Sequence, residues 1–330
     1  MLNYVIRRIA SGVVVLSIVS AIVFGIFYIL PADPARLACG KTCTEELVAE
    51  IRHNLELDVS LPTQYTRFIK GIFVGRTYLP DSEARLDCAA PCLGYSYQTD
   101  QPVTALLKDR LPATASIAFG ASILWLLIGL SSGIVSALRR GTMVDKFSQG
   151  VALGAASLQI YFVGLILQFI FVDKLAWLPM PGYTSPFDSP VDWLKQMALP
   201  WITLAFLLSA IYSRLTRAGM IEVMSEDYVR TARAKGLESR KINLKHVLRA
   251  AITPIVTVFG LDLGGLLGGA VITEYVFNVP GLGKLSTDAV ANVDLPVITG
   301  TVIFSAFFII TANIVVDLVY AALDPKVRLK

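Results

Sequence analysis

The sequence is poor in the residues that build catalytic centres. Only two of its 330 residues are histidines, His53 and His246, and no H-E-x-x-H motif occurs. No G-x-x-x-x-G-K-[ST] phosphate-binding loop is present either. A G-x-S-x-G match spans 129–133, but it lies inside an apolar run and not at a strand-to-helix turn, so helix packing explains it better than a nucleophile. We therefore expect a non-catalytic chain that needs no cofactor.

Charge is scarce as well. Charged residues make up 16% of the chain and hydrophobic residues 55%, and a soluble domain would not carry so many long apolar runs. The net charge of +4 is not a nucleic-acid signature, so we expect membrane lipid around the chain and no nucleic acid. The composition predicts an all-α integral membrane protein, because in lipid a helix satisfies all its own backbone groups. Six runs are long enough to cross a hydrocarbon core of ~30 Å: about 9–30, 112–138, 147–172, 198–214, 251–274 and 297–323.

The cations alternate between the segments that separate these runs. The first run is too long for a signal-peptide core and is not followed at once by an A-x-A-like site, so we expect a retained helix. Short cytoplasmic segments are enriched in Lys and Arg, which predicts both termini in the cytoplasm. The segments expected there carry Arg7 and Arg8, then Arg139, Arg140 and Lys146, then the cations of 214–250, and finally Lys326, Arg328 and Lys330.

The spacing of the runs divides the chain into three parts. Residues 1–30 form the N-terminal segment with the first transmembrane helix, and 31–111 form a large extracytoplasmic loop. Residues 112–330 form a core with five further transmembrane helices and the polar segment 214–250. In the outer loop, Leu47, Ile51 and Leu55 recur at four-residue steps and predict a helix over 44–57.

All four cysteines lie in the outer loop, as two C-x3-C pairs. An oxidising compartment favours disulfides, and four cysteines allow three pairings, between which the spacing does not choose. A tetrahedral metal site with four thiolates is the rival interpretation, and free thiols are a third. The residues concerned are Cys39, Cys43, Cys88 and Cys92.

The polar segment 214–250 has the pattern of two short helices separated by a glycine. Ser225 is a plausible N-cap for the first helix, and Gly236 is a natural end. Tyr228, Ala232 and Gly236 recur four residues apart on one face. Ser239 can cap the second helix, which Pro254 should kink or break. The segment therefore resembles a docking surface, although a positive loop that only sets topology is the simpler alternative.

The apolar runs contain a few residues that suit a path through the membrane. Asp262 lies inside the fifth run, where an acid should face protein or water. A structural hydroxyl partner on a neighbouring helix and a pore-lining position both fit it. Gly264, Gly265, Gly268 and Gly269 make two overlapping G-x-x-x-G pairs, which permit close helix contact or a wide lumen. Gln159 in the third run is a weaker polar candidate.

Two sequence motifs together resemble a known family. The stretches EDYVRTARAKGL at 226–237 and HVLRAAITP at 246–254 look like the cytoplasmic signature loop of peptide-type permease subunits of ABC importers. The segments 30–34, 97–102 and 111–114 fit the same family, as do EYVF at 274–277 with PGLG at 280–283, and DLPV at 294–297 with Gly300. The resemblance covers nearly the whole chain.

The resemblance implies a type I ABC importer permease in the bacterial inner membrane. Its implied partners are a homologous second permease subunit, ABC ATPase subunits and an extracytoplasmic substrate-binding protein. The implied ATPase-contacting residues are Ser225, Glu226, Asp227, Tyr228, Arg230, Ala232, Arg233, Ala234, Lys235 and Gly236. Candidates for the translocation path and outer gate are Asp262, Gly265, Gly269, Glu274 and Gln159, with Asp33 nearby.

The family resemblance also leaves alternatives open. Di- and oligopeptides are the expected substrates, with nickel complexes, glutathione or another small solute as alternatives on the same architecture. Both cysteine pairs look like additions to the outer loop of the family, which favours pairing between the two additions. A stand-alone secondary transporter is the rival class, but it predicts several intramembrane acids and internal repeats, and the sequence has one such acid and no clear repeat.

Overall fold

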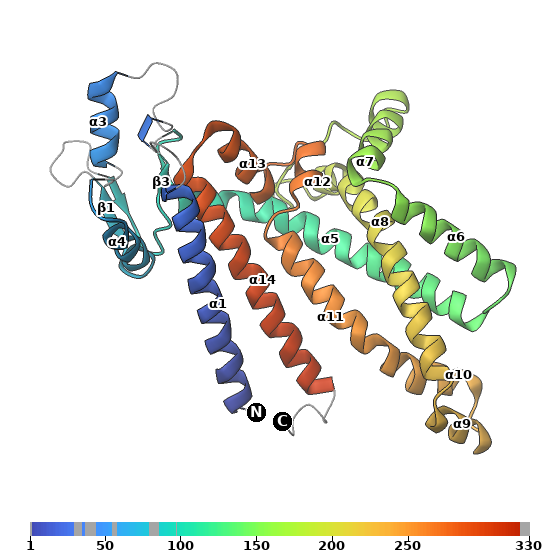
Figure 1. The fold of residues 1–330 in the computed structure, drawn as a ribbon. Helices are drawn as coiled ribbons and strands as arrows, with labels where there is room; N and C mark the ends of the chain where they lie inside the picture. The colour runs from blue at the N-terminus through green and yellow to red at the C-terminus, as the bar shows by residue number, and fades with distance from the viewer. Residues whose placement is uncertain are drawn as a thin grey trace.

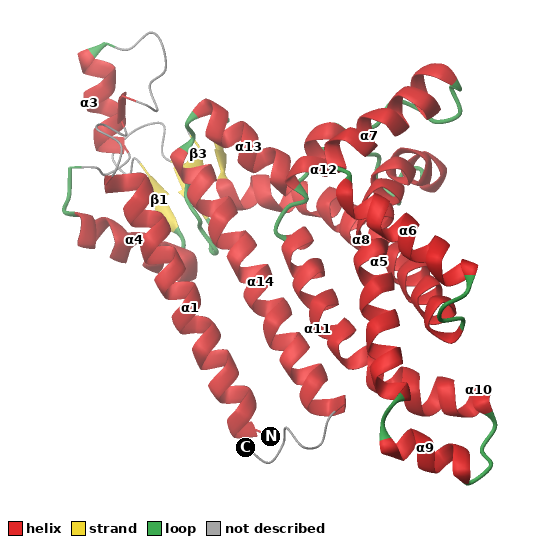
Figure 2. Ribbon diagram, turned by 45° about the vertical axis from the view of Figure 1, so that its right-hand side comes forward, coloured by secondary structure: helices red, strands yellow, loops and turns green. Residues whose placement is uncertain are grey.

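The computed structural model describes residues 2–29, 35–36, 44–54, 58–78, 86–96 and 98–323. Within these residues five helices are long and apolar enough to cross a membrane, and a bent helix pair makes a sixth candidate. Figures 1 and 2 show the long helices side by side as one bundle. They are α1 (Leu2–Ile29), α5 (Val103–Leu138), α8 (Pro190–Met224), α11 (Leu248–Leu267) and α14 (Leu295–Leu323), with α6 (Met143–Ser157) and α7 (Ile160–Gln168) as the bent pair.

The third predicted span, 147–172, is not one continuous helix. Its two halves, α6 and α7, are bent by 97° at a short break, and α7 runs on into a π-helical turn, η1 (Phe169–Lys174). Leu158 and Gln159 have extended backbones with ψ of 145° and 141°, which interrupts the helical hydrogen-bond ladder. No proline or glycine lies at the break, so the apolar pattern alone did not reveal it.

Two other spans are longer than predicted. Helix α5 begins at Val103, so the expected domain boundary at 111/112 falls inside a helix, and Pro112 lies within it. Helix α8 extends beyond the predicted 198–214 at both ends, because its polar turns continue the helix outside the apolar run. Apolar length therefore measures the membrane thickness and not the length of the helix.

The outer loop contains two helices and two short hairpins. Helix α3 (Glu45–Asn54) confirms the predicted helix up to Asn54, while 55–57 lie outside the described residues, and α4 (Leu61–Val74) follows. Strand β1 (Arg76–Tyr78) pairs antiparallel with β2 (Leu86–Cys88), and β3 (Tyr95–Ser96) pairs with β4 (Gln101–Pro102). The all-α prediction omitted these strands because they are only two or three residues long.

A disulfide joins Cys88 to Cys92, four residues apart. The resemblance favoured disulfides between the two cysteine pairs, and that prediction is wrong for Cys88 and Cys92. A metal site with all four thiolates is also wrong, because Cys88 and Cys92 bind each other. The bond can form locally because the turn after β2 brings the two Cα atoms to 5.6 Å, within the usual range for a disulfide. Cys39 and Cys43 lie outside the described residues.

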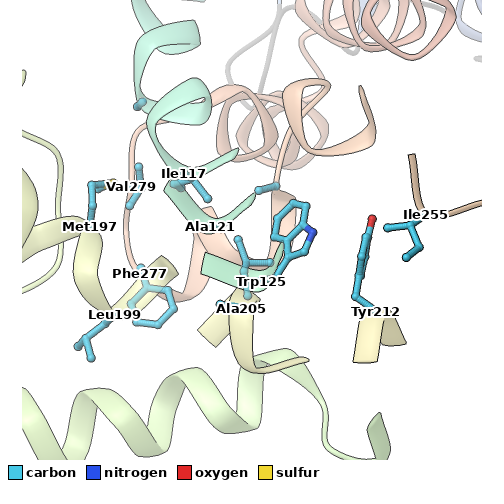
Figure 3. Packing of buried hydrophobic residues seen from close by; sticks show 13 residues of the cluster. Ile117, Ala121, Trp125, Met197, Leu199, Ala205, Tyr212, Ile255, Phe277 and Val279 are labelled. Carbon is cyan, nitrogen blue, oxygen red and sulfur yellow. The ribbon is translucent and has the colours of Figure 1, made fainter. Parts of the chain in front are cut away.

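The largest packed core lies where α5 meets α8. Trp125 on α5 and Tyr212 on α8 are fully buried, with ring centroids 6.1 Å apart (Figure 3). Their backbones approach closely because α5 carries glycine there: a Cβ at Gly129 would lie 2.6 Å from the Cβ of Tyr212, and one at Gly133 would lie 2.6 Å from the carbonyl oxygen of Ser213. The G-x-S-x-G match is thus a helix-packing motif, as predicted.

A buried carboxylate holds the segment between α11 and α14 together. This segment contains α12 (Val271–Val276) and α13 (Leu282–Asn292). Glu274 on α12 is 0% exposed, and its carboxylate accepts a 2.7 Å hydrogen bond from the Thr114 hydroxyl of α5. It also accepts from the backbone N–H groups of Lys284 at 2.9 Å and Ala270 at 3.2 Å. The Thr114 oxygen in turn accepts from the N–H of Leu282 at 2.8 Å, so one network joins α5, α12 and α13.

This network predicts that Glu274→Gln destabilises the fold. Whichever way the amide is turned, its NH2 group faces a buried backbone donor, which should cost about 1–3 kcal/mol. The thermal unfolding midpoint of the detergent-solubilised chain measures the effect. Asp288→Asn on the exposed side of α13 is the matched control and should change stability by less than ~0.5 kcal/mol. Equal midpoints for the two variants would contradict this role of Glu274.

Candidate coupling and pathway sites

The polar segment 214–250 forms the end of α8 and two short helices beyond it. These are α9 (Asp227–Ala234) and α10 (Ser239–Lys241), which continues through a π-helical turn, η2 (Ile242–Val247), into α11. The predicted pair of helices separated by a glycine is confirmed. In Figures 1 and 2, α9 and α10 lie beyond α8 and α11, at the end of the bundle where α1 begins.

An apolar cluster fixes α9 to the rest of the chain. Val229 and Ala232 are 0% and 9% exposed, and they pack with Met220 of α8 and with Ile242 and Val247 of η2. The Ala232 side chain therefore points toward α8 and η2 and does not share an exposed face with Tyr228. The small side chain of Ala232 lets α9 pack closely against α8 and η2 of the same chain.

The opposite side of α9 is exposed and mostly polar. Tyr228 is 48% exposed, and burial together with the Glu226 carboxylate raises the pKa of its phenol. Asp227 lies in the first turn, where a helix dipole favours an anion, and Arg230 lies 3.7 Å from it. Nine of the ten predicted coupling residues are exposed: Ser225, Glu226, Asp227, Tyr228, Arg230, Arg233, Ala234, Lys235 and Gly236.

The helix ends differ in part from the predicted ones. Gly236 has a φ of +72°, its N–H donates to the carbonyl of Arg233, and that of Leu237 donates to Ala232, which is a Schellman ending and confirms the predicted stop. Ser225 does not cap α9: its hydroxyl donates back to the carbonyl of Glu222 at the end of α8.

The remaining boundary predictions also need correction. Glu226 precedes α9, and Glu238, not Ser239, precedes α10. Pro254 lies inside α11 without breaking it, because the irregular turn of this helix comes earlier, in η2.

A buried ion pair at the root of this segment was missed by the sequence analysis. Asp145 at the start of α6 is 4% exposed and accepts two hydrogen bonds from the Arg217 guanidinium of α8, at 2.7 and 2.9 Å. It also accepts from the hydroxyl of Ser136 on α5 and the N–H of Gly141. The pair joins α5, α6 and α8 just before the chain enters α9. An acid among the cations of the 139–146 turn was the available signal.

Asp262 on α11 has the structural partner that one of the two interpretations required. The hydroxyl of Tyr212 donates a 2.7 Å hydrogen bond to its carboxylate. Tyr212 is fully buried, whereas Asp262 is partly exposed. The buried Tyr212 hydroxyl orients the Asp262 carboxylate, and the exposed part of Asp262 can still contact groups outside the chain.

The four predicted glycines at the C-terminal end of α11 and just after it have different surroundings. A Cβ at Gly264 would lie 2.4 Å from the Cβ of Ala312, and one at Gly268 would lie 3.0 Å from that of Ser305, so these two face α14 closely. Gly265 is exposed and has no atom within 4 Å of its Cβ position. Gly269 follows the end of α11 with a φ of +133° and lies against the backbone of Gly283. Only Gly265 therefore faces open space.

The other predicted path residues lie near the ends of helices. Gln159 is exposed at the break between α6 and α7, not in the middle of a helix. Glu274 is enclosed by donors from its own chain, so its carboxylate does not reach a path surface. The Ser96 hydroxyl of the β3–β4 hairpin donates to Asp294, whose pKa is raised by burial, and this contact fixes the hairpin to the start of α14. Asp33 lies outside the described residues.

The sequence matches two family models that together cover almost all of the chain. Residues 1–118 match the N-terminal model of the binding-protein-dependent transport system membrane component. Residues 110–329 match the binding-protein-dependent transport system inner membrane component. The junction between the two matches lies inside α5.

Curated relatives align with the chain from end to end. A probable peptide ABC transporter permease, y4tP of Sinorhizobium fredii, is 35% identical over 98% of this chain and 99% of its own length. The glutathione transport system permease GsiC of Pectobacterium atrosepticum is 38% identical over the full length of both chains. GsiC of Escherichia coli K12 is 36% identical, also over the full length of both.

The fold is similar to that of a solved transporter. Chains from two crystal forms of the inward-facing MetNI methionine ABC transporter superpose with TM-scores of 0.52 and 0.54. They cover 67% of this chain and 97% of the solved chains, at 14% and 16% identity, which shows the fold alone. The family matches, the full-length relatives and the helical bundle agree: the chain belongs to the binding-protein-dependent transport system inner membrane components, as a multi-pass inner-membrane permease subunit of an ABC importer.

Proposed function

We propose that this permease pairs with a homologous second permease and imports short peptides across the bacterial inner membrane. A separate substrate-binding protein delivers the substrate to the outer face, and separate ATPase subunits supply the energy. The observation that carries the proposal is the end-to-end similarity to permeases named for peptide and for glutathione transport. Glutathione is itself a tripeptide, so the two names share one substrate chemistry.

Both termini and the segment 214–250 lie on the cytoplasmic side in this proposal, and 31–111 lies outside. The ATPase contacts the exposed side of α9, with Tyr228 as the central anchor. Large, partly exposed aromatic side chains are enriched among the residues that dominate binding at protein interfaces. The buried side of α9, through Val229 and Ala232, makes the helix move together with α8 and η2. A push on α9 therefore acts directly on two membrane helices.

The path through the membrane runs along α11 and the break between α6 and α7. Asp262, held by Tyr212, and the open Gly265 lie on the same helix, three residues apart. Gln159 adds an exposed amide at the helix break. Gly269 and Glu274 serve this path indirectly, by fixing the segment between α11 and α13 through the contacts of Gly283 and Thr114. That segment forms part of the outer gate.

The import proposal predicts ATP-dependent peptide uptake. The chain, its second permease, the ATPases and the binding protein are reconstituted in liposomes, and accumulation of labelled di- and tripeptides and of glutathione is measured. Uptake should require ATP on the side of the liposome membrane that carries the ATPases and the binding protein on the opposite side. Uptake by this chain alone, without ATP, would support the secondary transporter instead. ATP-dependent uptake of a nickel complex but of no peptide would retain the importer and refute the substrate class.

The coupling proposal predicts that Tyr228→Ala weakens ATPase binding. Loss of a central interface aromatic costs about 2 kcal/mol or more, roughly thirtyfold in affinity. Binding of purified ATPase to the permease pair in nanodiscs measures this loss. Tyr161→Ala, at a 52% exposed tyrosine of α7, is the matched control and should leave ATPase affinity unchanged. A photocrosslinker at position 228 that never captures the ATPase would refute the coupling role.

The path proposal predicts that Asp262→Ala and Asp262→Asn lower transport at unchanged expression. We expect a decrease of roughly tenfold, or ~1.4 kcal/mol on the limiting barrier. Tyr212→Phe removes only the hydroxyl partner and should mainly lower stability, by about 1 kcal/mol. Uptake per assembled complex distinguishes the two effects. Normal uptake by Asp262→Ala would show that this acid has a structural role only.

A further inference from the structure

A groove between α5, α6 and α8 is not used by the proposed transport mechanism. It is an open groove with a volume of about 450 Å³, which is within the range of pockets that bind small molecules. Its rim consists of exposed apolar side chains, among them Phe147 and Val151 of α6 and Ile128 of α5. Its floor consists of small residues, because Ala152 and Ala155 of α6 pack against Ala210 of α8. Helices α5 and α8 are membrane-spanning candidates and α6 is half of the bent candidate pair, so we infer that the groove opens toward lipid.

A buried hydroxyl without a partner lines this groove. Ser213 of α8 is 3% exposed, and its Oγ makes no hydrogen bond among the described residues. A polar atom buried in this way normally has a partner, because leaving it unpaired is costly. The neighbouring Ser209 differs, since its hydroxyl donates to the carbonyl of Phe206. An acceptor in the groove would satisfy Ser213.

Three exposed cations lie on or beside the turn that joins α5 and α6, next to one end of the groove. Val135 and Val144 line it at this end, on either side of the turn that joins α5 and α6. Arg139, Arg140 and Lys146 lie on or beside that turn, are exposed, and make no ion pair among the described residues. The acid of the turn, Asp145, is already neutralised by Arg217. The turn therefore presents an uncompensated positive charge to a lipid headgroup.

The depth of Ser213 fits a phospholipid. It lies four residues before Arg217 on α8, which is about 6 Å further into the membrane. Arg217 is level with Asp145, in the first turn of α6. The ester carbonyls of a phospholipid lie just below its phosphate, and they accept hydrogen bonds. One lipid can thus reach the cations with its phosphate, Ser213 with an ester carbonyl, and the apolar walls with an acyl chain.

We propose that the groove between α5, α6 and α8 is a binding site for one anionic phospholipid. The three cations select the negative headgroup, and Ser213 and the alanine floor hold the glycerol and acyl region. Ordinary solvation by bulk lipid would need neither the buried hydroxyl nor a groove of this depth.

The test uses the assembled importer in nanodiscs that contain a photoactivatable lipid with the reactive group in its acyl chain. Phosphatidylglycerol is the anionic probe and phosphatidylcholine the neutral one, and mass spectrometry maps the labelled peptides. Phosphatidylglycerol should label the groove preferentially. Replacing Arg139, Arg140 and Lys146 by glutamine should reduce that preference, roughly fivefold per cation.

Filling the groove should remove the site. Val151→Trp places a bulky side chain at the 47% exposed rim and should lower labelling about tenfold, which corresponds to ~1.4 kcal/mol. Leu153→Trp, at a 61% exposed position of α6 outside the groove, should leave labelling unchanged. Ser213→Ala keeps the shape of the groove, does not threaten folding, and should lower lipid retention several-fold.

Three outcomes would overturn the proposal. Equal labelling by the two lipids would mean that the groove contacts bulk lipid without selection. Equal labelling of Val151→Trp and Leu153→Trp would mean that the lipid lies elsewhere. A photocrosslinker at position 151 that captures the second permease in place of lipid would identify the groove as a subunit contact.

Discussion

The close contact between α5 and α8 is the constraint on which the rest of this molecule depends. Glycines at 129 and 133 let the two backbones approach, and Trp125 and Tyr212 fill the contact. From that fixed position α8 holds its other neighbours through specific polar bonds. Tyr212 binds Asp262 of α11, and Arg217 binds Asp145 of α6. A side chain larger than glycine at 129 would shift α8 and weaken all of these bonds together, because the buried interior is already close-packed.

This arrangement explains how a surface helix of eight residues could act on a bundle of long ones. Helix α9 has too few residues to be stable alone, and it depends on Val229 and Ala232 packing against α8 and η2. The bond between Arg217 and Asp145 then ties the same end of α8 to α5 and α6. In the proposed mechanism, a force applied to Tyr228 reaches three membrane helices within a few residues of α9.

Asp262 of α11 and Glu274 of α12 show two different surroundings of an acid in this bundle. Glu274 is completely enclosed and receives donors from three parts of the chain, so it organises the polypeptide around itself. Asp262 has one donor and a partly exposed side, so it can still interact with something outside the chain. Both acids looked like path candidates in the sequence. Their different surroundings depend on Thr114 and Tyr212, which lie 160 and 50 residues away in the chain.

The sequence by itself determined the membrane class, the approximate positions of five spanning helices and a sixth candidate, the two helices around Gly236 and the family. Apolar length, charge distribution and local motifs are properties of short stretches. Only the tertiary structure decided that the third predicted span bends at Leu158, that Cys88 binds Cys92, and that Ala232 faces inward while Tyr228 faces out. It also decided that Gly264 packs on α14 while Gly265 is open, and that Arg217 pairs with Asp145. The physical reason is the same in each case: which side of a helix is covered, and which charges meet, depends on residues far apart in the chain that packing brings together.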